Sequence, residues 1–332
     1  MNLFELTKSL IDIPSVTGDE LAVGQHLSKY LEELGYQVER QEVAQDRFNV
    51  IATQAEPPRI VFSTHMDTVP PFIESREDEE FVYGRGSCDA KGIIAAQIVA
   101  AERLRAEDVN DVGLLFTVDE ELSSIGAQAA NKHAVARECQ FLINGEPTDN
   151  RLATGTKGSV RVIITTDGRA AHSAYPEAGE SAIEKLLDIL QEIRACAWPE
   201  DSFFGTTTCN IGVLGGGTRP NVIADKARAE LQIRLGIDIE HVKRVLEDAV
   251  RGRGQLEYAS AHNPVRLFAV PGFDQCVVRF TTDVPYLSNW GQPLLIGPGS
   301  ILDAHTDHER IAKHELEKAV QLYVDLVKKL NS

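Results

Sequence analysis

The chain has 332 residues and a formal net charge of −17, with 43% hydrophobic and 25% charged residues. This length is sufficient for two domains, and the composition is typical of a soluble globular protein. The strong acidity argues against nonspecific binding to nucleic acid, because the phosphate backbone would repel it. The longest apolar runs are too short to span a bilayer, so no membrane association is expected.

The cysteines indicate an intracellular protein. Five cysteines are scattered along the chain without a CxxC pair, which favours reduced thiols and argues against a thiolate zinc site. The N-terminal segment lacks the basic start, long apolar stretch and cleavage site of a signal peptide. We therefore expect a cytoplasmic location.

The first part of the chain alternates between short apolar runs and helical patterns. Capping-box patterns at Asn2–Glu5 and Thr17–Glu20 predict two helices, and Thr306–Glu309 predicts a last helix over 307–330. Further helices are expected at 92–104, which is apolar nearly all round, and at 124–136. The expected strands lie at 47–53, 59–64, 112–118 and 139–144. This alternation predicts an α/β domain whose mixed sheet carries helices on both faces.

The pattern changes after Gly155. Strands are expected at 158–166, 207–214, 225–236 and 255–260, and helices at 179–196 and 238–252. This order is the split-βαβ pattern of a small α+β sandwich. The first pattern resumes after Pro264, with a helix near 273–280 and a strand at 293–296. We therefore predict that residues 158–265 form a domain inserted into a catalytic domain made of residues 1–157 and 266–332.

Histidines and carboxylates follow the apolar runs of the first pattern. The residues are His65, Asp67, Asp89, Glu120, Glu121, Glu146 and His305. Active sites of α/β proteins assemble at such strand ends. If Glu120 and Glu121 finish a strand, they point to opposite faces, so one can bind metal while the other faces substrate. Mixed imidazole and carboxylate ligation suits zinc, with cobalt or manganese as weaker candidates.

Each of these residues also has an ordinary structural role to weigh. Asp89 precedes a predicted helix and could serve only as its cap, and His65 could be a hydrogen-bonded histidine at a strand end. His308 and His314 compete with His305 as ligands, but both are expected inside the last helix. The joint pattern, rather than any single residue, favours a metal site.

Seven motifs resemble the M20 family of metallopeptidases and amidohydrolases and occur in the family's order. They are "STHMDTVP" (63–70), "YGRGSCDAKG" (83–92), "DEE" (119–121), "NGEP" (144–147), "AAHSAYP" (170–176), "GGTRPNVIADKA" (216–227) and "GPGSILDAHTDHE" (297–309). That family includes acetylornithine deacetylase, succinyl-diaminopimelate desuccinylase and aminoacylase. Its final motif commonly ends in Asp-Glu-Tyr, so His308 and Arg310 are departures.

The resemblance implies a role for each motif residue. The ligands of two zinc ions would be His65, Asp89, Glu121, Glu146 and His305, with Asp89 bridging. Asp67 would orient His65 and Glu120 would be the general base, and the Asp89–Ala90 peptide bond is expected to be cis. The inserted domain would be a lid that also forms a homodimer interface. Its His172 would reach an active site, commonly the partner's, and the expected substrate contacts are Tyr175, Asn221 and Arg234.

These expectations define a di-zinc amidohydrolase. We predict removal of an acyl group, chiefly acetyl, from an N-acyl amino acid, as acetylornithine deacetylase does, with Asn221 and Arg234 holding the substrate carboxylate. The alternatives with the same site are a di- or tripeptidase and a succinyl-diaminopimelate desuccinylase. The desuccinylase's Ser-Gly-Gly-Thr-Ser-Asp run is replaced here by residues 280–291, where Thr282 and Asp283 stand. A binding protein without metal is a remote alternative, since Glu120 and the full ligand set are present.

Overall fold

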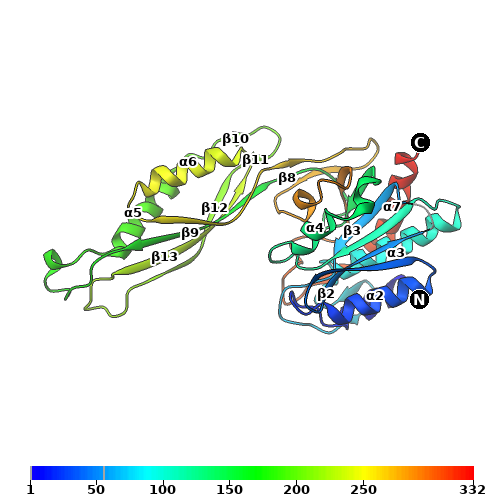
Figure 1. The fold of residues 1–332 in the computed structure, drawn as a ribbon, viewed down its shortest axis with the longest axis horizontal. Coiled ribbons are helices and arrows are strands. Elements are labelled where there is room, and N and C mark those ends of the chain that lie inside the picture. Colours follow the sequence, from blue (N-terminus) through cyan, green and yellow to red (C-terminus); the bar gives the residue numbers. More distant parts are fainter. Residues whose placement is uncertain (1, 55–56) are drawn as a thin grey trace. The chain divides into compact units, whose positions relative to one another are not determined.

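The computed structural model describes residues 2–54 and 57–332, which fold into two compact units (Figure 1). Unit 1 contains the chain up to Thr154 together with Leu267–Cys276 and Thr282–Ser332. Unit 2 contains Gly155–Arg266 and Val277–Thr281. None of the helices in the described part of the chain is both long and apolar enough to cross a membrane.

Unit 1 is built on a mixed sheet. Its strands, in spatial order, are β1 (Gln37–Ala44), β2 (Arg47–Thr53), β6 (Val112–Thr117), β3 (Ile60–His65), β7 (Phe141–Asn144), β17 (Gln292–Leu295) and β8 (Leu152–Thr156). Strands β6, β3, β7 and β17 are parallel, whereas β1, β2 and β8 pair antiparallel. The carboxyl ends of the four parallel strands therefore lie at one edge of the sheet.

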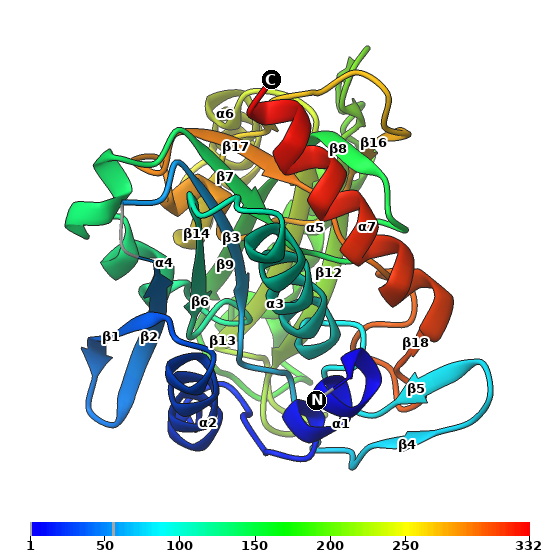
Figure 2. The same ribbon diagram turned by 90° about the vertical axis from the view of Figure 1, so that its right-hand side faces the viewer.

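Helices cover both faces of this sheet, as the apolar runs predict. They are α1 (Leu3–Ile11), α2 (Leu21–Glu33), α3 (Lys91–Ala106), α4 (Ile125–Ala130) and α7 (Lys313–Leu330). Successive side chains of β3 enter different cores: Phe62 packs with α3 and α7, and Val61 packs with α4 and Trp290 on the other face. Figure 2 shows α3 and α7 side by side over the first face. The prediction of a mixed α/β fold is confirmed.

A small second sheet in unit 1 combines three short antiparallel strands. Their order is β18 (Arg310–Ala312), β5 (Phe81–Tyr83) and β4 (Arg76–Glu77). Strands β15 (Val265–Arg266) and β16 (Gln275–Val278) lie where the chain passes between the two units. Single 3-10 turns are η1 (Ala134–Arg137), η2 (Pro176–Ala178) and η3 (Val284–Tyr286).

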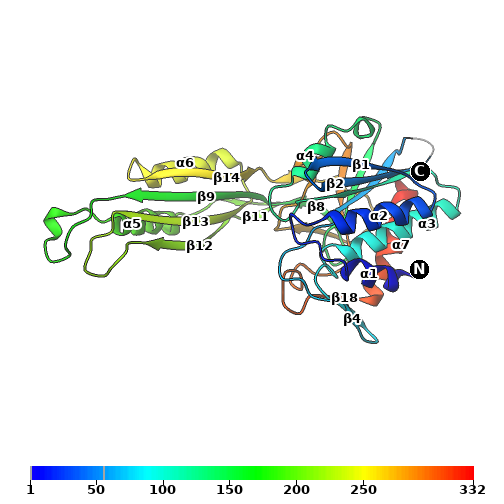
Figure 3. The same cartoon turned by 60° about the horizontal axis from the view of Figure 1, so that its bottom comes forward.

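Unit 2 is a four-stranded antiparallel sheet with two helices on one face (Figure 3). The strand order is β12 (Thr208–Gly216), β13 (Lys226–Leu235), β9 (Gly158–Asp167) and β14 (Gln255–His262), and the helices are α5 (Ala182–Ala195) and α6 (Ile239–Val250). A short hairpin joins β10 (Glu200–Asp201) and β11 (Gly205–Thr206). Alternate residues of β9, such as Val160 and Val162, pack against α5 and α6 in a separate core.

Two of the three expected capping boxes are wrong. Asn2 and Glu5 do form a capping box at α1. Thr17 instead donates a hydrogen bond to Asp67, and Glu20 pairs with Arg47. The last helix begins at Lys313 instead of 307, because residues 310–312 form a strand and the Glu309 carboxylate binds elsewhere. Tertiary partners for these side chains outweighed the local capping pattern.

Other local predictions also need correction. Residues 275–278, expected in a helix over 273–280, form strand β16, which pairs with β8. The helix expected over 124–136 is a short α4 followed by the 3-10 turn η1. Strand β1 was not predicted. His308, expected inside the last helix, lies in the loop before β18, whereas His314 lies in α7.

Candidate active site

Asp67 organises the end of strand β3. Its carboxylate accepts the backbone N–H groups of Glu120 at 3.1 Å and Glu121 at 3.2 Å, and the hydroxyl of Thr17 at 2.8 Å. The Nδ1 atom of His65 lies 3.0 Å from the Asp67 carbonyl oxygen and 3.4 Å from its carboxylate. Burial raises the pKa of Asp67, but these contacts, His65 first, outweigh it and leave the pKa below its usual value. Asp67 thus fixes both the His65 ring and the turn that carries Glu120 and Glu121.

Glu120 and Glu121 do not finish a strand, contrary to the sequence argument. Strand β6 ends at Thr117, and Asp119 has a φ of 70°, so the two glutamates lie on a turn. Their different directions therefore come from the turn, which the Asp67 carboxylate holds, rather than from strand alternation.

Asp89 lies between two imidazole rings. Its Oδ1 is 2.9 Å from the Nε2 of His65, and its Oδ2 is 3.4 Å from the Nε2 of His305. The same His305 nitrogen is 2.8 Å from Glu121 Oε1. Ligand atoms of His65, Asp89 and Glu121 all lie within 4.8 Å of one another. Each oxygen of Asp89 thus faces a different histidine, which suits a carboxylate that bridges two cations.

Two further carboxylates, those of the buried Glu146 and the half-buried Glu120, belong to the same acidic surroundings. Glu146 is 4% exposed and its Oε1 has no hydrogen-bond partner within the described residues. Burial, and then the charge of Asp89, raise the pKa of Glu146 well above its usual value. Burial, and then the charge of Glu146, likewise raise the pKa of Glu120 well above its usual value. So many buried carboxylates are stable as anions only with nearby cations, so this donor set fits divalent metal ions.

Glu309 supports the loop that carries Asp89, and the sequence did not reveal this. Its Oε1 accepts the backbone N–H groups of Gly86, Cys88 and Asp89 at 3.0, 3.1 and 3.1 Å. Its Oε2 lies 2.5 Å from Nη1 of the buried Arg85. The Asp89–Ala90 peptide bond at the end of this loop is cis, and α3 follows directly. The only signal in the sequence was the place of Glu309 four residues after His305, which a capping-box pattern concealed.

Asp283 is a second buried residue to which the sequence assigned no role. It is 2% exposed, and its Oδ2 accepts a hydrogen bond from Thr117 at 2.7 Å. Burial raises its pKa to about 6. Its charge also raises the pKa values of Glu120 and Glu146, so Asp283 belongs to the same acidic surroundings.

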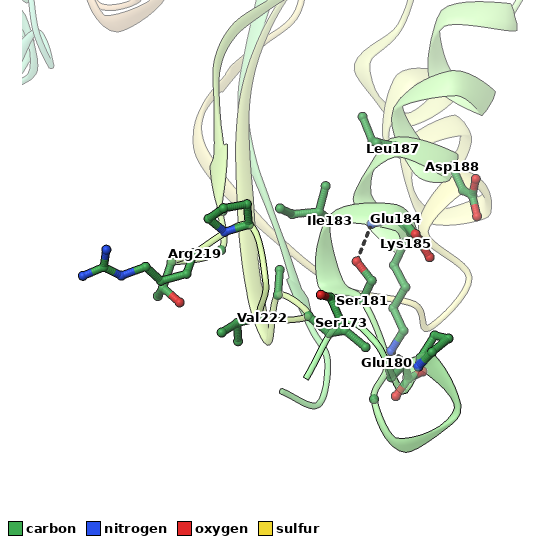
Figure 4. A pocket seen from close by; sticks show the side chains of 18 residues that line it. Ser173, Glu180, Ser181, Ile183, Glu184, Lys185, Leu187, Asp188, Arg219 and Val222 are labelled. Atoms are coloured by element: carbon green, nitrogen blue, oxygen red, sulfur yellow. Dashed lines mark hydrogen bonds and ion pairs between the residues drawn. The ribbon is translucent and has the colours of Figure 1, made fainter. Parts of the chain in front are cut away.

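In unit 2, three predicted residues meet at one end of the sheet. His172 forms a β-bridge with Val222, and Ser173 N–H donates to the Asn221 carbonyl at 3.0 Å. The His172 and Tyr175 rings are 6.3 Å apart in an edge contact. A pocket of about 1040 Å³ opens at this end of unit 2, and in Figure 4 the Arg219 side chain points away from the Ser181–Glu184 side of it.

Arg234 lies at the opposite end of unit 2. It pairs in register with Ser159 near the start of β9, while Lys226, at the other end of β13, pairs with Asp167. Arg234 is eight residue steps along the strand from Lys226, which corresponds to roughly 27 Å at about 3.4 Å per residue. Within one copy, Asn221 and Arg234 therefore cannot contact the same carboxylate, contrary to the sequence expectation.

Histidines and carboxylates gathered in this way at the strand ends of a mixed α/β sheet define a metal-dependent hydrolase. The sequence model of peptidase family M20/M25/M40 matches residues 61–329. The chain therefore belongs to this family, as the motifs predicted.

Similar proteins agree with this membership. A Peptidase M20 domain-containing protein of Schizosaccharomyces pombe is 37% identical over 338 residues, covering 98% of this chain and 84% of that protein. A probable carboxypeptidase of Aspergillus clavatus is 36% identical over 366 residues, covering 98% and 88%.

Solved structures share the fold. Aminopeptidase PepT from Bacillus cereus superposes with a TM-score of 0.79 at 21% identity, covering 99% of this chain and 98% of that one. An M20 family metallo-carboxypeptidase from Sulfolobus solfataricus gives 0.80 at 16% identity, covering 99% of both chains. A dinuclear metal binding peptidase of the M20 family from Bacillus subtilis gives 0.70 at 16%, covering 98% of both.

Proposed function

We propose that this protein is a peptidase that uses two divalent metal ions to hydrolyse short peptides. Zinc is the metal that suits the ligands best. The observation that carries the proposal is the position of Asp89, whose two oxygens face His65 and His305 separately. Glu121 lies beside His305, and the buried Glu146, whose Oε1 has no hydrogen-bond partner within the described residues, would be a further ligand. Cobalt or manganese would also accept these donors.

The chain's own residues supply proton transfer. Two metal ions at this site would polarise the scissile carbonyl and lower the pKa of the attacking water. Glu120 accepts a proton from that water and returns it to the departing amine. Asp67 holds the backbone of Glu120 in place through its 3.1 Å hydrogen bond.

A peptide substrate is favoured over an N-acetyl amino acid by the named functions of the relatives. Carboxypeptidases and peptidases recur among them, which supports the peptidase alternative better than deacetylation. Steady-state rates on matched dipeptides, tripeptides and N-acetyl amino acids would separate the two. We expect the highest kcat/KM for peptides. A preference for the N-acetyl amino acids would instead support a deacetylase, and a preference for a succinyl amino acid would support a desuccinylase.

Arg234 is proposed to bind the substrate's free carboxylate. The chain carries a formal charge of −17, so an anionic substrate needs a cation within the site. Arg234→Ala should raise KM for a free-acid peptide much more than for its amide. Equal effects on both would assign Arg234 another role, such as bracing the segment that contains Thr281, to which it donates a hydrogen bond at 3.2 Å.

We further propose that unit 2 is a lid through which two copies form a homodimer. Among the described residues, strand β12 pairs only with β13, and its Val213 and Leu214 are 49% and 55% exposed. Such an edge tends to pair with another strand. The separation of Asn221 from Arg234 within unit 2 supports a site completed by two copies, one supplying His172 and Asn221 and the other Arg234.

Complementation tests this sharing. His172→Ala and Glu120→Ala should each be nearly inactive, and co-expression should restore part of the activity in mixed dimers. No recovery in proven heterodimers would show that each chain uses its own His172.

We also propose that the protein is cytoplasmic, as the scattered cysteines led us to expect. Cell fractionation would test this location.

A further inference from the structure

Two arginines and a tyrosine form a row across the small sheet of unit 1. In the strand register, Tyr83 of β5 is paired with Arg310 of β18 on one side and Arg76 of β4 on the other. Residues that are directly paired project from the same face of a sheet. The next pair, Val82 with Ile311, is buried and faces the core. The Arg76–Tyr83–Arg310 row therefore lies on the face away from the core.

Aromatic rings hold both guanidinium groups in place. The Arg76 guanidinium carbon is 3.6 Å from the centroid of Tyr83, and that of Arg310 is 4.4 Å from the centroid of Phe81. Stacking on a ring limits the motion of an arginine while its N–H edges stay available to an oxygen ligand. Less ordering entropy would then be lost when an anion binds.

A pocket of about 480 Å³ opens over this row. It is lined by Arg76, Tyr83, Asp303, Thr306, His308 and Arg310. This volume is within the range of small-molecule sites. His308 and Arg310 are the two residues at which the final motif departs from the pattern common in the family, so the common motif does not account for them.

Two arginines and one carboxylate, that of Asp303, line the pocket. Arg310 Nε is 3.7 Å from Asp303 Oδ1, a half-exposed contact that involves one edge of the guanidinium. Across residues 2–54 and 57–332, no carboxylate lies within ion-pair distance of Arg76. The nearby Asp78 attracts Arg76 electrostatically, but its oxygens accept hydrogen bonds from the Tyr83 hydroxyl at 2.8 Å and from the N–H groups of Glu80 and Phe81. Its oxygens are therefore already bonded within the hairpin.

We propose that this pocket, whose lining includes none of the metal ligands, is a binding site for a small anion bearing phosphate or carboxylate groups. Arg76 and Arg310 would each present an N–H fork to one oxygen pair, with His308 and the Thr306 hydroxyl as further polar partners. The anion is either a free small molecule or an acidic group of the peptide substrate. In a strongly acidic protein, this cationic pocket would concentrate such a group locally.

Binding of inorganic phosphate to the metal-loaded protein tests the site by calorimetry. Phosphate can also bind the metal centre, so the comparison is between variants. Arg76→Ala and Arg310→Ala should each weaken one binding step at least about tenfold, and Arg76→Lys should weaken it less because the charge remains. Arg40→Ala is the matched control, since Arg40 also stacks on a ring, that of Phe48, outside the pocket. Thermal unfolding would confirm that each variant is folded.

A pair of peptides that differ only by Glu and Gln distinguishes the two sources of the anion. If the Arg76 and Arg310 variants lose a preference for the Glu peptide, the occupant is the substrate's acidic group. If they lose only phosphate binding, the occupant is a free anion. Unchanged phosphate binding together with unchanged Glu–Gln selectivity in both variants would overturn the proposal, whether or not the protein proves to be a peptidase.

Discussion

The contact between Arg85 and Glu309 should govern the stability of the loop that carries Asp89. Both side chains are buried, at 2% exposure each, and Glu309 also accepts three backbone N–H groups. In Glu309→Gln, the amide oxygen can still accept those three groups, but the amide nitrogen faces Arg85 and leaves its charge unpaired. Removing one partner of a buried ion pair costs about 3–5 kcal/mol.

The expected loss of stability differs between the two partners. Arg85→Met leaves the Glu309 carboxylate with its three N–H donors, so we expect a smaller loss, about 2 kcal/mol, partly from the Thr306 carbonyl that Arg85 also contacts. The double variant has no unpaired charge. It should therefore be more stable than Glu309→Gln alone, with a coupling energy of at least about 2 kcal/mol.

Urea unfolding of the four metal-free proteins, followed by circular dichroism, measures this cycle. Metal affinity, from competition with a chelator, should fall in Glu309→Gln because the loop positions Asp89. Additive effects within about 0.5 kcal/mol would refute the reasoning, since they would mean that Arg85 and Glu309 do not depend on each other.

Three further predictions concern single sites. Gly92→Ala should destabilise the folded protein by about 3 kcal/mol or more, because the new Cβ would lie 2.2 Å from the Ser87 carbonyl oxygen. In the control Gly215→Ala, the new Cβ meets nothing within 4 Å, so the loss in the same unfolding assay should be less than about 1 kcal/mol. Cys139 is buried, and burial raises its pKa to about 12, so it should resist a thiol reagent at pH 8 that modifies the half-buried Cys196, as peptide mapping would show. In the metal-free protein, the pKa of Asp283 is raised to about 6, so its protonated form stabilises the folded state below about pH 4 and this stabilisation is lost as the pH rises through about 6. The loss amounts to about 3 kcal/mol of unfolding free energy. Asp283→Asn should therefore flatten the pH dependence of the unfolding free energy in that window.

Secondary structure was predicted correctly from the sequence where a segment carried a single local pattern. The apolar runs that precede His65 and Glu146 had no competing local pattern, and both form the expected strands. Thr17, Glu20 and Glu309 carried capping patterns, but each had a stronger partner distant in the sequence. No local rule reveals such partners, so the support of the Asp89 loop was not predictable.

The separation of Asn221 and Arg234 was also hidden. Asn221 belongs to a recognised motif and Arg234 matches a family position, but such a match says nothing about which end of a strand a residue occupies. Only the register of β13 against β9 places them apart. The same register argument located the arginine row of the small sheet, whose strands are too short to predict from their sequence.

The role of Glu120 is the most direct test of the whole account. Glu120→Gln and Glu121→Gln should be loaded with zinc, assayed for bound metal, and compared with the unmodified protein for turnover of its best peptide. We predict that Glu120→Gln keeps two metal ions per chain while turnover falls by about 10²–10⁴-fold, because only proton transfer is lost. Glu121→Gln should instead lose metal, since it removes a ligand charge. Near-normal turnover by a fully metal-loaded Glu120→Gln protein would contradict the assignment of Glu120 as the base and the mechanism built on it.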